Sequence, residues 1–340
     1  MYRHLLVPID GTELSVDTIG QAVEFARALG ARITFFHAIQ DHASSQFGQA
    51  EMARVAAPED GVYACEGRAR ELLTKAESAA RAYGVPCSSA SCANNTAHAA
   101  IIAAARDAGC DLIFMASHGR RSKIGMMLGS QTLKVLTEST IPVLVCATRE
   151  PAAPARAIAI IRNEHRSLAA VLHATMHLLA TARRNHAAPD AASLRAAVRY
   201  IQNFPVALHH PKEEGFLFRK LRERTSALDA ELDELERQHV RDRELVAELA
   251  AQIERCLDAN VPVGPEIEQS VSDYASFVWE HLGREEGVIL PAAQRHLKPE
   301  DWADIDAAFS ANRDPCFDAA TEAEYRQLFL RIVSLASHFG

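Results

Sequence analysis

The pattern of apolar positions changes character near residue 150. Before that point, short apolar runs alternate with stretches of helical periodicity, whereas after it only long helical patterns occur. The expected strands are 4–9, 33–39, a weaker run ending at 92, 111–116 and 141–146. The expected helices are 13–29, 66–83, 96–108 and 130–137, and 41–61 is expected to be a loop. Because parallel neighbours need helical crossovers, this order predicts an α/β domain with a doubly wound parallel five-stranded sheet.

Local signals mark the ends of several of these helices. Gly30 follows the first helical pattern, and glycine is favoured just past a helix end. Asn94 is expected to cap the third helix, and Ser130 suits the N-cap of the fourth, because both side chains can accept a hydrogen bond from an unpaired backbone N–H. These signals place the loops between the strands and helices.

The second half of the chain predicts an all-α up-and-down four-helix bundle, because four long helical patterns follow one another with short breaks. They cover 157–183, 191–223, 227–258 and 266–297. A linker is expected at 148–156, where the sequence TREPAAPAR contains two prolines among small residues. The expected domains are therefore an α/β domain at 1–147, the bundle at 157–298 and a C-terminal helical extension at 299–340.

Composition agrees with an ordinary soluble protein of two domains. The 340 residues exceed one usual core, and a net charge of -8 with 24% charged residues gives no reason to expect a nucleic-acid partner. No apolar run approaches the ~20 residues that a membrane span needs, and the start lacks a signal-peptide pattern, so we expect a cytoplasmic protein with no membrane partner. Seven scattered cysteines without a CxxC pair argue against a disulfide framework and a thiolate zinc site.

Histidine gives the first indication of a metal site, since five histidines precede residue 150 and ten follow it. Within the bundle, a single histidine in one helix is followed 44 or 42 residues later by the pattern HxxxEE. The first half of this repeat contains His165, His209 and Glu213, and the second half contains His239, His281 and Glu285. Residues four apart on a helix can reach the same ion, so the repeat predicts four imidazoles and two carboxylates inside the bundle.

One lone HxxxE on a helix is more often a solvated face, and only the matched recurrence favours a metal site. The ligand types suit iron or manganese, and a pair of non-haem iron ions is the best single interpretation. The second helix leaves two registers open, because His210 with Glu214 has the same spacing as His209 with Glu213. Pro211 lies inside this helix and is expected to kink it.

Residues 157–297 resemble the hemerythrin-like, cation-binding HHE family through their H…HxxxE…H…HxxxE pattern. The resemblance implies a di-iron centre that binds or responds to oxygen, nitric oxide or iron. The chain lacks the HxxxH third helix of the oxygen-storing worm hemerythrins, so reversible oxygen carriage is not the leading expectation.

The first half contains a candidate phosphate site. In the segment Met115-Ala-Ser-His-Gly119-Arg120, Gly119 is followed by nine residues and then by Gly129-Ser130 at the start of an expected helix. Unpaired N–H groups at a helix N-terminus favour anions, although the glycines could equally serve only a sharp turn and Ser130 only a cap.

Residues 1–147 resemble the universal stress protein family, from the opening LLVPID to the closing TIPVLVC. Members that bind ATP carry G-x2-G-x9-G-[S/T], which this chain matches except that Ala116 replaces the first glycine. The resemblance places Asp10 and Ala38 near adenine and ribose and implies phosphate contacts from the second glycine onward. The complete set of implied nucleotide contacts is Pro8, Asp10, Ala38, Gly119, Arg120, Gly129, Ser130, Gln131 and Thr132. It also implies a homodimer formed through the last strand, 141–146.

The leading hypothesis is a stress-response sensor or regulator, in which a di-iron bundle responds to oxygen, nitric oxide, redox state or iron. The first domain would couple this response to ATP or another adenine nucleotide, bound as a ligand, because no Walker motif or catalytic base stands out. No catalytic residue is assigned. Two alternatives are a di-iron enzyme that removes peroxide or nitric oxide or oxidises ferrous iron, and an iron store on a dimerising scaffold.

Overall fold

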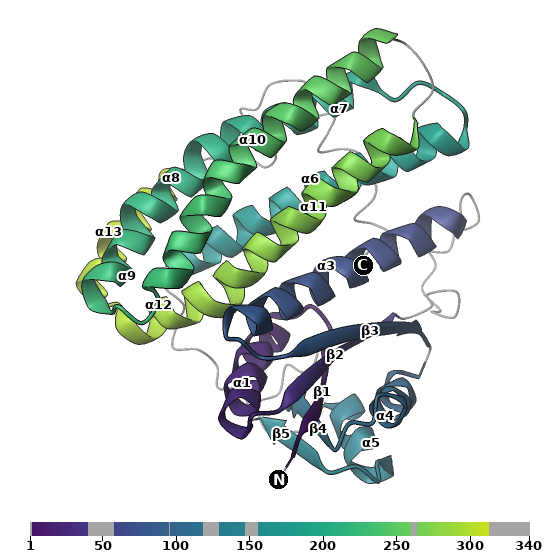
Figure 1. The fold of residues 1–340 in the computed structure, drawn as a ribbon, viewed down its shortest axis with the longest axis vertical. Coiled ribbons are helices and arrows are strands. Elements are labelled where there is room, and N and C mark those ends of the chain that lie inside the picture. The colour runs from purple at the N-terminus through teal and green to yellow at the C-terminus, as the bar shows by residue number, and fades with distance from the viewer. Residues whose placement is uncertain are drawn as a thin grey trace. The chain divides into compact units, whose positions relative to one another are not determined.

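The computed structural model describes residues 2–39, 58–94, 96–117, 129–146, 156–259 and 264–312, without the side chains of 13–16, 58–64 and 259. The chain forms two compact units, one built around a β-sheet and one built from long helices. Figure 1 shows the strands of the sheet and the long helices. Among the described residues, no helix combines the length and apolar character that crossing a membrane requires.

The first unit contains a parallel five-stranded sheet, as the sequence predicts. Its strands are β1 (His4–Pro8), β2 (Arg32–Ile39), β3 (Cys87–Ala93), β4 (Leu112–Ala116) and β5 (Val143–Cys146). They lie in the order β3-β2-β1-β4-β5, and every pair is parallel. The strand order therefore reverses at β1, where β2 lies on one side and β4 on the other.

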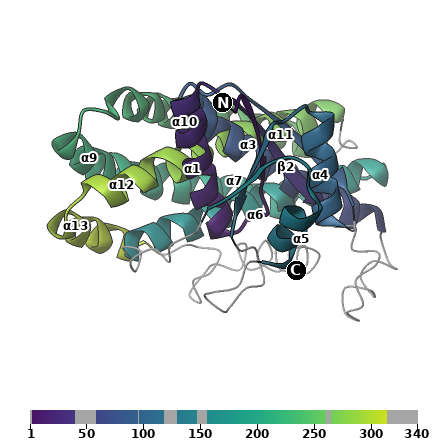
Figure 2. The same cartoon turned by 90° about the horizontal axis from the view of Figure 1, so that it is seen from below.

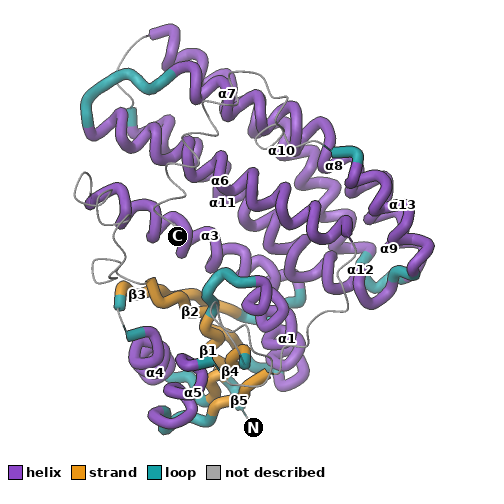
Figure 3. Tube along the Cα trace, turned by 180° about the vertical axis from the view of Figure 1, so that it is seen from behind, coloured by secondary structure: helices purple, strands orange, loops and turns teal. Residues whose placement is uncertain are grey.

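Helices cover both faces of this sheet (Figure 3). The helices are α1 (Glu13–Leu29), α3 (Pro58–Ala82), α4 (Ala97–Asp107) and α5 (Ser130–Glu138). Leu5 and Val7 of β1 point toward one core with α1 and α3, while Leu6 points toward a second core with α4 and α5. Alternate residues of a strand face opposite sides, so one buried apolar strand supplies both cores.

Several boundaries in this unit differ from the sequence-based expectation. Helix α3 begins at Pro58, so the expected loop ends earlier than residue 61. Proline is tolerated in the first turn of a helix, because the N–H that it lacks would be unpaired there. Thr96, and not Asn94, is the N-cap of α4, and Asn94 accepts a hydrogen bond from the Thr96 N–H instead. Gly129 is the N-cap of α5, which makes Ser130 its first helical residue. Gly30 has a positive φ of 64°, as expected for a residue that ends a helix.

Residues 156–296 form the predicted helical bundle. Its long helices are α6 (Arg156–Arg184), a composite helix from Ala191 to Arg224, α10 (Asp229–Ala259) and a second composite helix from Pro265 to His296. They run alongside one another in Figure 1. Buried side chains at helical spacing, such as Leu168, Leu172 and Leu179 of α6, form the apolar interior.

The two composite helices contain π-helical turns, which the sequence analysis did not predict. The first comprises α7 (Ala191–Ile201), η2 (Gln202–His209), α8 (His210–Lys212), η3 (Glu213–Phe218) and α9 (Arg219–Arg224). The second comprises α11 (Pro265–Arg284), η4 (Glu285–Ile289) and α12 (Leu290–His296). Pro205 and Pro211 cannot donate a backbone hydrogen bond, which accounts for broken α-helical pairing in the first of them. Such wider turns occur frequently at functional sites.

One further helix, α13 (Pro299–Ser310), follows the bundle and packs against α6. Figure 2 shows α9, α12 and α13 together at the same end of the bundle. Asp306 of α13 accepts a hydrogen bond from the Ala157 N–H at 2.6 Å, and Lys212 donates to the Ala308 carbonyl at 2.9 Å. Of the extension expected at 299–340, the described residues contain this helix, which ends at Ser310, and residues 313–340 lie outside the described residues.

Candidate metal centre

All six predicted metal ligands face the interior of the bundle. His165 lies on α6, His239 on α10 and His281 in the last turn of α11, while the other three occur where α-helical and π-helical turns meet. His209 ends η2, Glu213 begins η3 and Glu285 begins η4, one turn after His281. None of the six is more than 4% exposed. Burying so many polar groups is costly unless they are paired or bound to an ion.

These six residues form two overlapping groups. The first contains His165, His209, Glu213 and Glu285, and the second contains Glu213, His239, His281 and Glu285. Within each group, one donor atom from every residue lies within 4.8 Å of the others. Glu213 and Glu285 belong to both groups, which is the arrangement expected of carboxylates that bridge a pair of metal ions.

Among the six predicted ligands, the shortest imidazole–carboxylate contacts join residues of the same composite helix. Nε2 of His209 lies 3.2 Å from Oε1 of Glu213, and Nε2 of His281 lies 3.2 Å from Oε1 of Glu285. These two pairs are the HxxxE spacings of the sequence. The imidazole–carboxylate contacts that join ligands of different helices are longer, with 3.6 Å between Nε2 of His239 and Oε2 of Glu213.

A second set of carboxylates lies behind the imidazole rings. Nδ1 of His209 is 2.6 Å from Oε2 of Glu164, and Nδ1 of His239 is 2.8 Å from Oε1 of Glu214. The Asn312 amide in turn donates to Oε1 of Glu164 at 2.9 Å. Carboxylates on the Nδ1 side fix the tautomer and orientation of metal-binding imidazoles, because they leave Nε2 directed at the ion.

The electrostatics show how much negative charge surrounds His209. Burial alone would lower the pKa of this imidazole, but Glu213 and Glu164 outweigh burial and raise the pKa well above its usual value. On the other side of the site, the hydrogen bond from His239 lowers the pKa of Glu214. The carboxylates around His209 therefore favour a positive charge in this part of the site.

The donor set fits a pair of iron or manganese ions. Glu213 is fully buried, yet neither of its carboxylate oxygens has a hydrogen-bond partner among the described residues. Contacts with imidazole nitrogens at ion-pair distances are the nearest compensation for the burial of this carboxylate. A bound metal ion would satisfy both of its oxygens. The groups contain only imidazole and carboxylate donors and no thiolate, which favours iron or manganese over zinc in a thiolate site.

The structure also places the alternative register of the second helix. His210 and Glu214 do not form a second pair equivalent to His209 and Glu213. Glu214 is 38% exposed at its side chain and contacts His239 from outside, whereas His210 lies 4% exposed beside His239 and His281. The sequence did not lead us to expect that Glu164 and Glu214 contact the Nδ1 atoms of the ligand imidazoles. The second glutamate of HxxxEE was the only signal that pointed to either.

The residues implied in nucleotide binding are divided between described and undescribed parts of the chain. Gly119 and Arg120 lie outside the described residues. Pro8 and Asp10 lie at the carboxyl end of β1, and Ala38 lies near the carboxyl end of β2. Gly129, Ser130, Gln131 and Thr132 form the start of α5, which follows β4. The described positions among these lie at the carboxyl edge of the sheet, on both sides of the point where the strand order reverses.

Local contacts hold several of these residues in place. The Asp10 carboxylate accepts hydrogen bonds from the Thr12 N–H at 3.0 Å and from the Thr12 hydroxyl at 2.7 Å. Thr132 is buried and donates to the Ala116 carbonyl at 3.1 Å. Gln131 accepts a hydrogen bond from the His98 N–H at 3.1 Å, whereas Ser130 is exposed at the helix start.

A parallel doubly wound domain and a buried His/Glu bundle in one chain define a fusion of an α/β domain with a cation-binding helical domain. Comparison with family models identifies both parts. The universal stress protein family matches residues 1–147, and the hemerythrin HHE cation binding domain matches residues 156–293. The chain therefore joins a universal stress protein domain to a hemerythrin-type HHE domain.

Three solved structures that are similar to this chain each match less than half of it. Hypothetical protein MJ0577 is 23% identical over 44% of this chain and 99% of its own, with a TM-score of 0.38. A universal stress family protein from Burkholderia pseudomallei is 19% identical over 43% of this chain and 96% of its own, with a TM-score of 0.33. A universal stress protein in complex with cAMP is 22% identical over 44% of this chain and 98% of its own, with a TM-score of 0.31.

Proposed function

We propose that this chain is a stress-response sensor or regulator whose helical bundle holds a pair of iron ions. One observation carries the proposal: two groups of buried donors share the same two carboxylates, Glu213 and Glu285. The pair of ions would respond to oxygen, nitric oxide, redox state or iron supply. Bound iron would supply one-electron redox chemistry and a coordination position for a small ligand.

The protein side of this site would hold the ions and limit access to them. Glu213 and Glu285 would neutralise part of the charge of both ions, while Glu164 and Glu214 orient the imidazoles of His209 and His239. Aromatic rings pack around the site. Phe309 packs edge-on against His209, and Phe218 stacks on His239. An apolar surround of this kind restricts water and influences the redox potential of the ions.

We propose further that the universal stress protein domain binds an adenine nucleotide as a ligand. In open parallel sheets, ligands bind beyond the carboxyl ends of the strands at the point where the strand order reverses. Here that point lies between β1 and β4, beside Asp10 and the start of α5. Exposed N–H groups at the start of α5 would favour the phosphates.

A homodimer formed through β5 completes the proposal. This strand is at the edge of the sheet, and its Leu144 side chain is 36% exposed. Exposed apolar edge strands pair readily with a second chain. Coupling of the metal state to nucleotide binding requires that each ligand have different affinities for two states of the protein.

The test of the metal proposal is elemental analysis and optical spectroscopy of protein prepared without oxygen and then exposed to air. We expect about two irons per chain, and absorption from ligand-to-metal charge transfer that develops in air. The comparison variant is His281→Ala, Glu285→Ala, which removes one ligand of the second group and one shared carboxylate. Folded protein that stays metal-free and colourless after anaerobic iron addition would contradict the proposal.

A further inference from the structure

His210 is buried although the preceding residue already faces the interior. Adjacent side chains of an α-helix project about 100° apart, so one helix face does not ordinarily bury both of two successive histidines. Here His209 and His210 are each 4% exposed. His209 ends η2 and His210 begins α8, so the pair lies where a π-helical turn meets an α-helical turn. This junction directs both imidazoles into the bundle.

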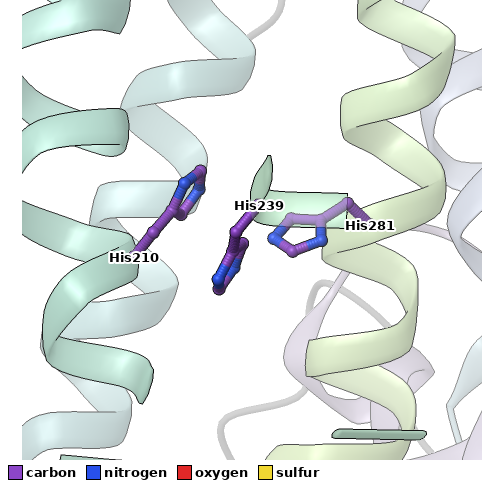
Figure 4. Close-up of side chains that lie close together, drawn as sticks. All are labelled: His210, His239 and His281. Carbon is purple, nitrogen blue, oxygen red and sulfur yellow. The ribbon is translucent and has the colours of Figure 1, made fainter. Parts of the chain in front are cut away.

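The His210 ring contacts the second donor group and not the first. It stacks on His239 with ring centroids 4.1 Å apart and an interplanar angle of 8°. His210, His239 and His281 together form a further group whose donor atoms lie within 4.8 Å of one another. Figure 4 shows the three side chains turned toward one another from three separate helical segments.

His210 also shares the carboxylate arrangement of the expected ligands. Nδ1 of His209 lies against Glu164 and Nδ1 of His239 against Glu214. Nδ1 of His210 likewise faces a carboxylate, but at the longer distance of 3.8 Å from Oδ2 of Asp242, an ion-pair distance and not a hydrogen bond; Asp242 lies on α10 and is 4% exposed. A carboxylate on the Nδ1 side directs Nε2 at a metal ion.

We propose that His210 is a seventh ligand, and that it supplies a third imidazole to the ion held by His239 and His281. The inference rests on the proposed metal function. The ion of the first group would then have two imidazoles, from His165 and His209, and the ion of the second group would have three. The two ions would consequently differ in their number of imidazole ligands, and the shared carboxylates Glu213 and Glu285 would lie between them.

The experiment loads wild-type protein and His210→Ala anaerobically with ⁵⁷Fe and measures iron content and Mössbauer spectra. In the wild type we expect two iron environments of equal intensity. In His210→Ala one environment is lost or shifted while the other is unchanged, and iron content falls toward about one per chain. Added imidazole is expected to restore part of the altered signal, because it can occupy the vacated coordination position.

Two further variants separate ligation from packing. His173→Ala removes a buried imidazole that stacks on Trp279 at 5.4 Å and belongs to none of the donor groups found among the described residues. It should leave both iron signals intact. Asp242→Asn should shift the same signal as His210→Ala, by a smaller amount. Circular dichroism verifies folding, and His210→Gln replaces His210→Ala if the alanine variant does not fold.

The outcomes distinguish this inference from the proposed function. Wild-type protein with two irons, together with a folded His210 variant whose iron content and spectrum match the wild type, would overturn the seventh ligand and leave the di-iron proposal standing. Wild-type protein that takes up no iron would overturn both. Equal changes in both iron environments of the variant would show that His210 acts through packing and not through ligation.

Discussion

Carboxylates on the Nδ1 side of the imidazole rings determine how these imidazoles are oriented in the site. Glu164 contacts the Nδ1 atom of His209 and also accepts a hydrogen bond from Asn312, so its position is fixed from two directions. Partners of this kind commonly contribute a factor of about 10 to 100 in metal affinity, because a free imidazole can rotate and change tautomer. The carboxylate next to a ligand therefore matters nearly as much as the ligand.

Substitution of Glu164 tests this dependence. In Glu164→Gln, the amide is a weaker acceptor for the Nδ1 proton of His209, so we expect iron affinity to fall by about 10-fold or more. Competition with a chelator measures the affinity. Glu254→Gln, which removes a carboxylate from the exposed pair with Arg195, serves as the control and should bind iron normally. Equal affinities of all three proteins would contradict the role assigned to Glu164.

Ser130 provides the corresponding test in the universal stress protein domain. It is the first residue of α5 and is exposed, so Ser130→Asp introduces charge without disturbing a buried contact. Negative charge beside phosphate should abolish adenine nucleotide binding, which calorimetric titration measures. Ser139→Asp, just past the end of the same helix, is the control for added charge. Unchanged affinity of Ser130→Asp would exclude the proposed phosphate site.

At the scale of elements, the sequence predicts helices well and predicts their internal irregularities poorly. The period of apolar residues located α1 and each long helix of the bundle to within a few residues, because burial of one face is a local signal. The π-helical turns depend on which backbone groups Pro205 and Pro211 leave unpaired and on the packing around them. Consequently, the HxxxE spacing indicated the donor groups, but the inward orientation of His210 required the structure.

The contacts that hold α13 predict how the stability of the fold depends on pH. Asp301 accepts hydrogen bonds from Arg224 at 2.7 and 2.8 Å and from the Lys298 N–H at 3.0 Å. The Arg224 hydrogen bonds, acting against desolvation, lower the pKa of Asp301 from its usual value to about 2. Because the folded pKa is below the unfolded one, the ionised carboxylate stabilises the fold above about pH 4, and this contribution disappears as pH falls toward about 2.

In metal-free protein, Asp301→Asn should therefore lower the free energy of unfolding by about 2 kcal/mol at pH 7. The difference from wild type should shrink as pH falls from about 4 to about 2. Urea unfolding at a series of pH values measures it. Asp304→Asn changes an exposed neighbour on α13 and should have a small effect at every pH. A constant difference for Asp301→Asn across this range would refute the assigned pKa.

At the scale of the whole molecule, the metal groups join segments that are far apart in the sequence. Donors come from α6, from η2, α8 and η3 of the first composite helix, from α10, and from α11 and η4 of the second composite helix. The duplicated spacing in the sequence predicted these contributions, since it is a regular signal. By contrast, Glu164 and Asp242 have no distinctive spacing, and their roles depend on how separate helices pack.

Iron binding should accordingly stabilise these distant segments together. A ligand that binds only the folded state stabilises it, and here the contacts are spread over four helical regions. Hydrogen exchange should slow on iron loading in the peptides that contain His165, His209, His239 and His281. The variant His281→Ala, Glu285→Ala should show little protection. Protection restricted to one peptide would argue against a shared site.

The hydrogen bond from Asn312 to Glu164 has a practical consequence for the choice of expression boundaries. The hemerythrin-type match ends at residue 293, before α13 begins. A fragment trimmed to that boundary would discard Asn312, and also the carbonyl of Ala308 that receives the Lys212 ammonium near the ligand-bearing turn. Such a fragment would contain every predicted ligand and yet lack part of the support that orients His209. Isolated bundles prepared for spectroscopy should therefore extend to at least residue 312.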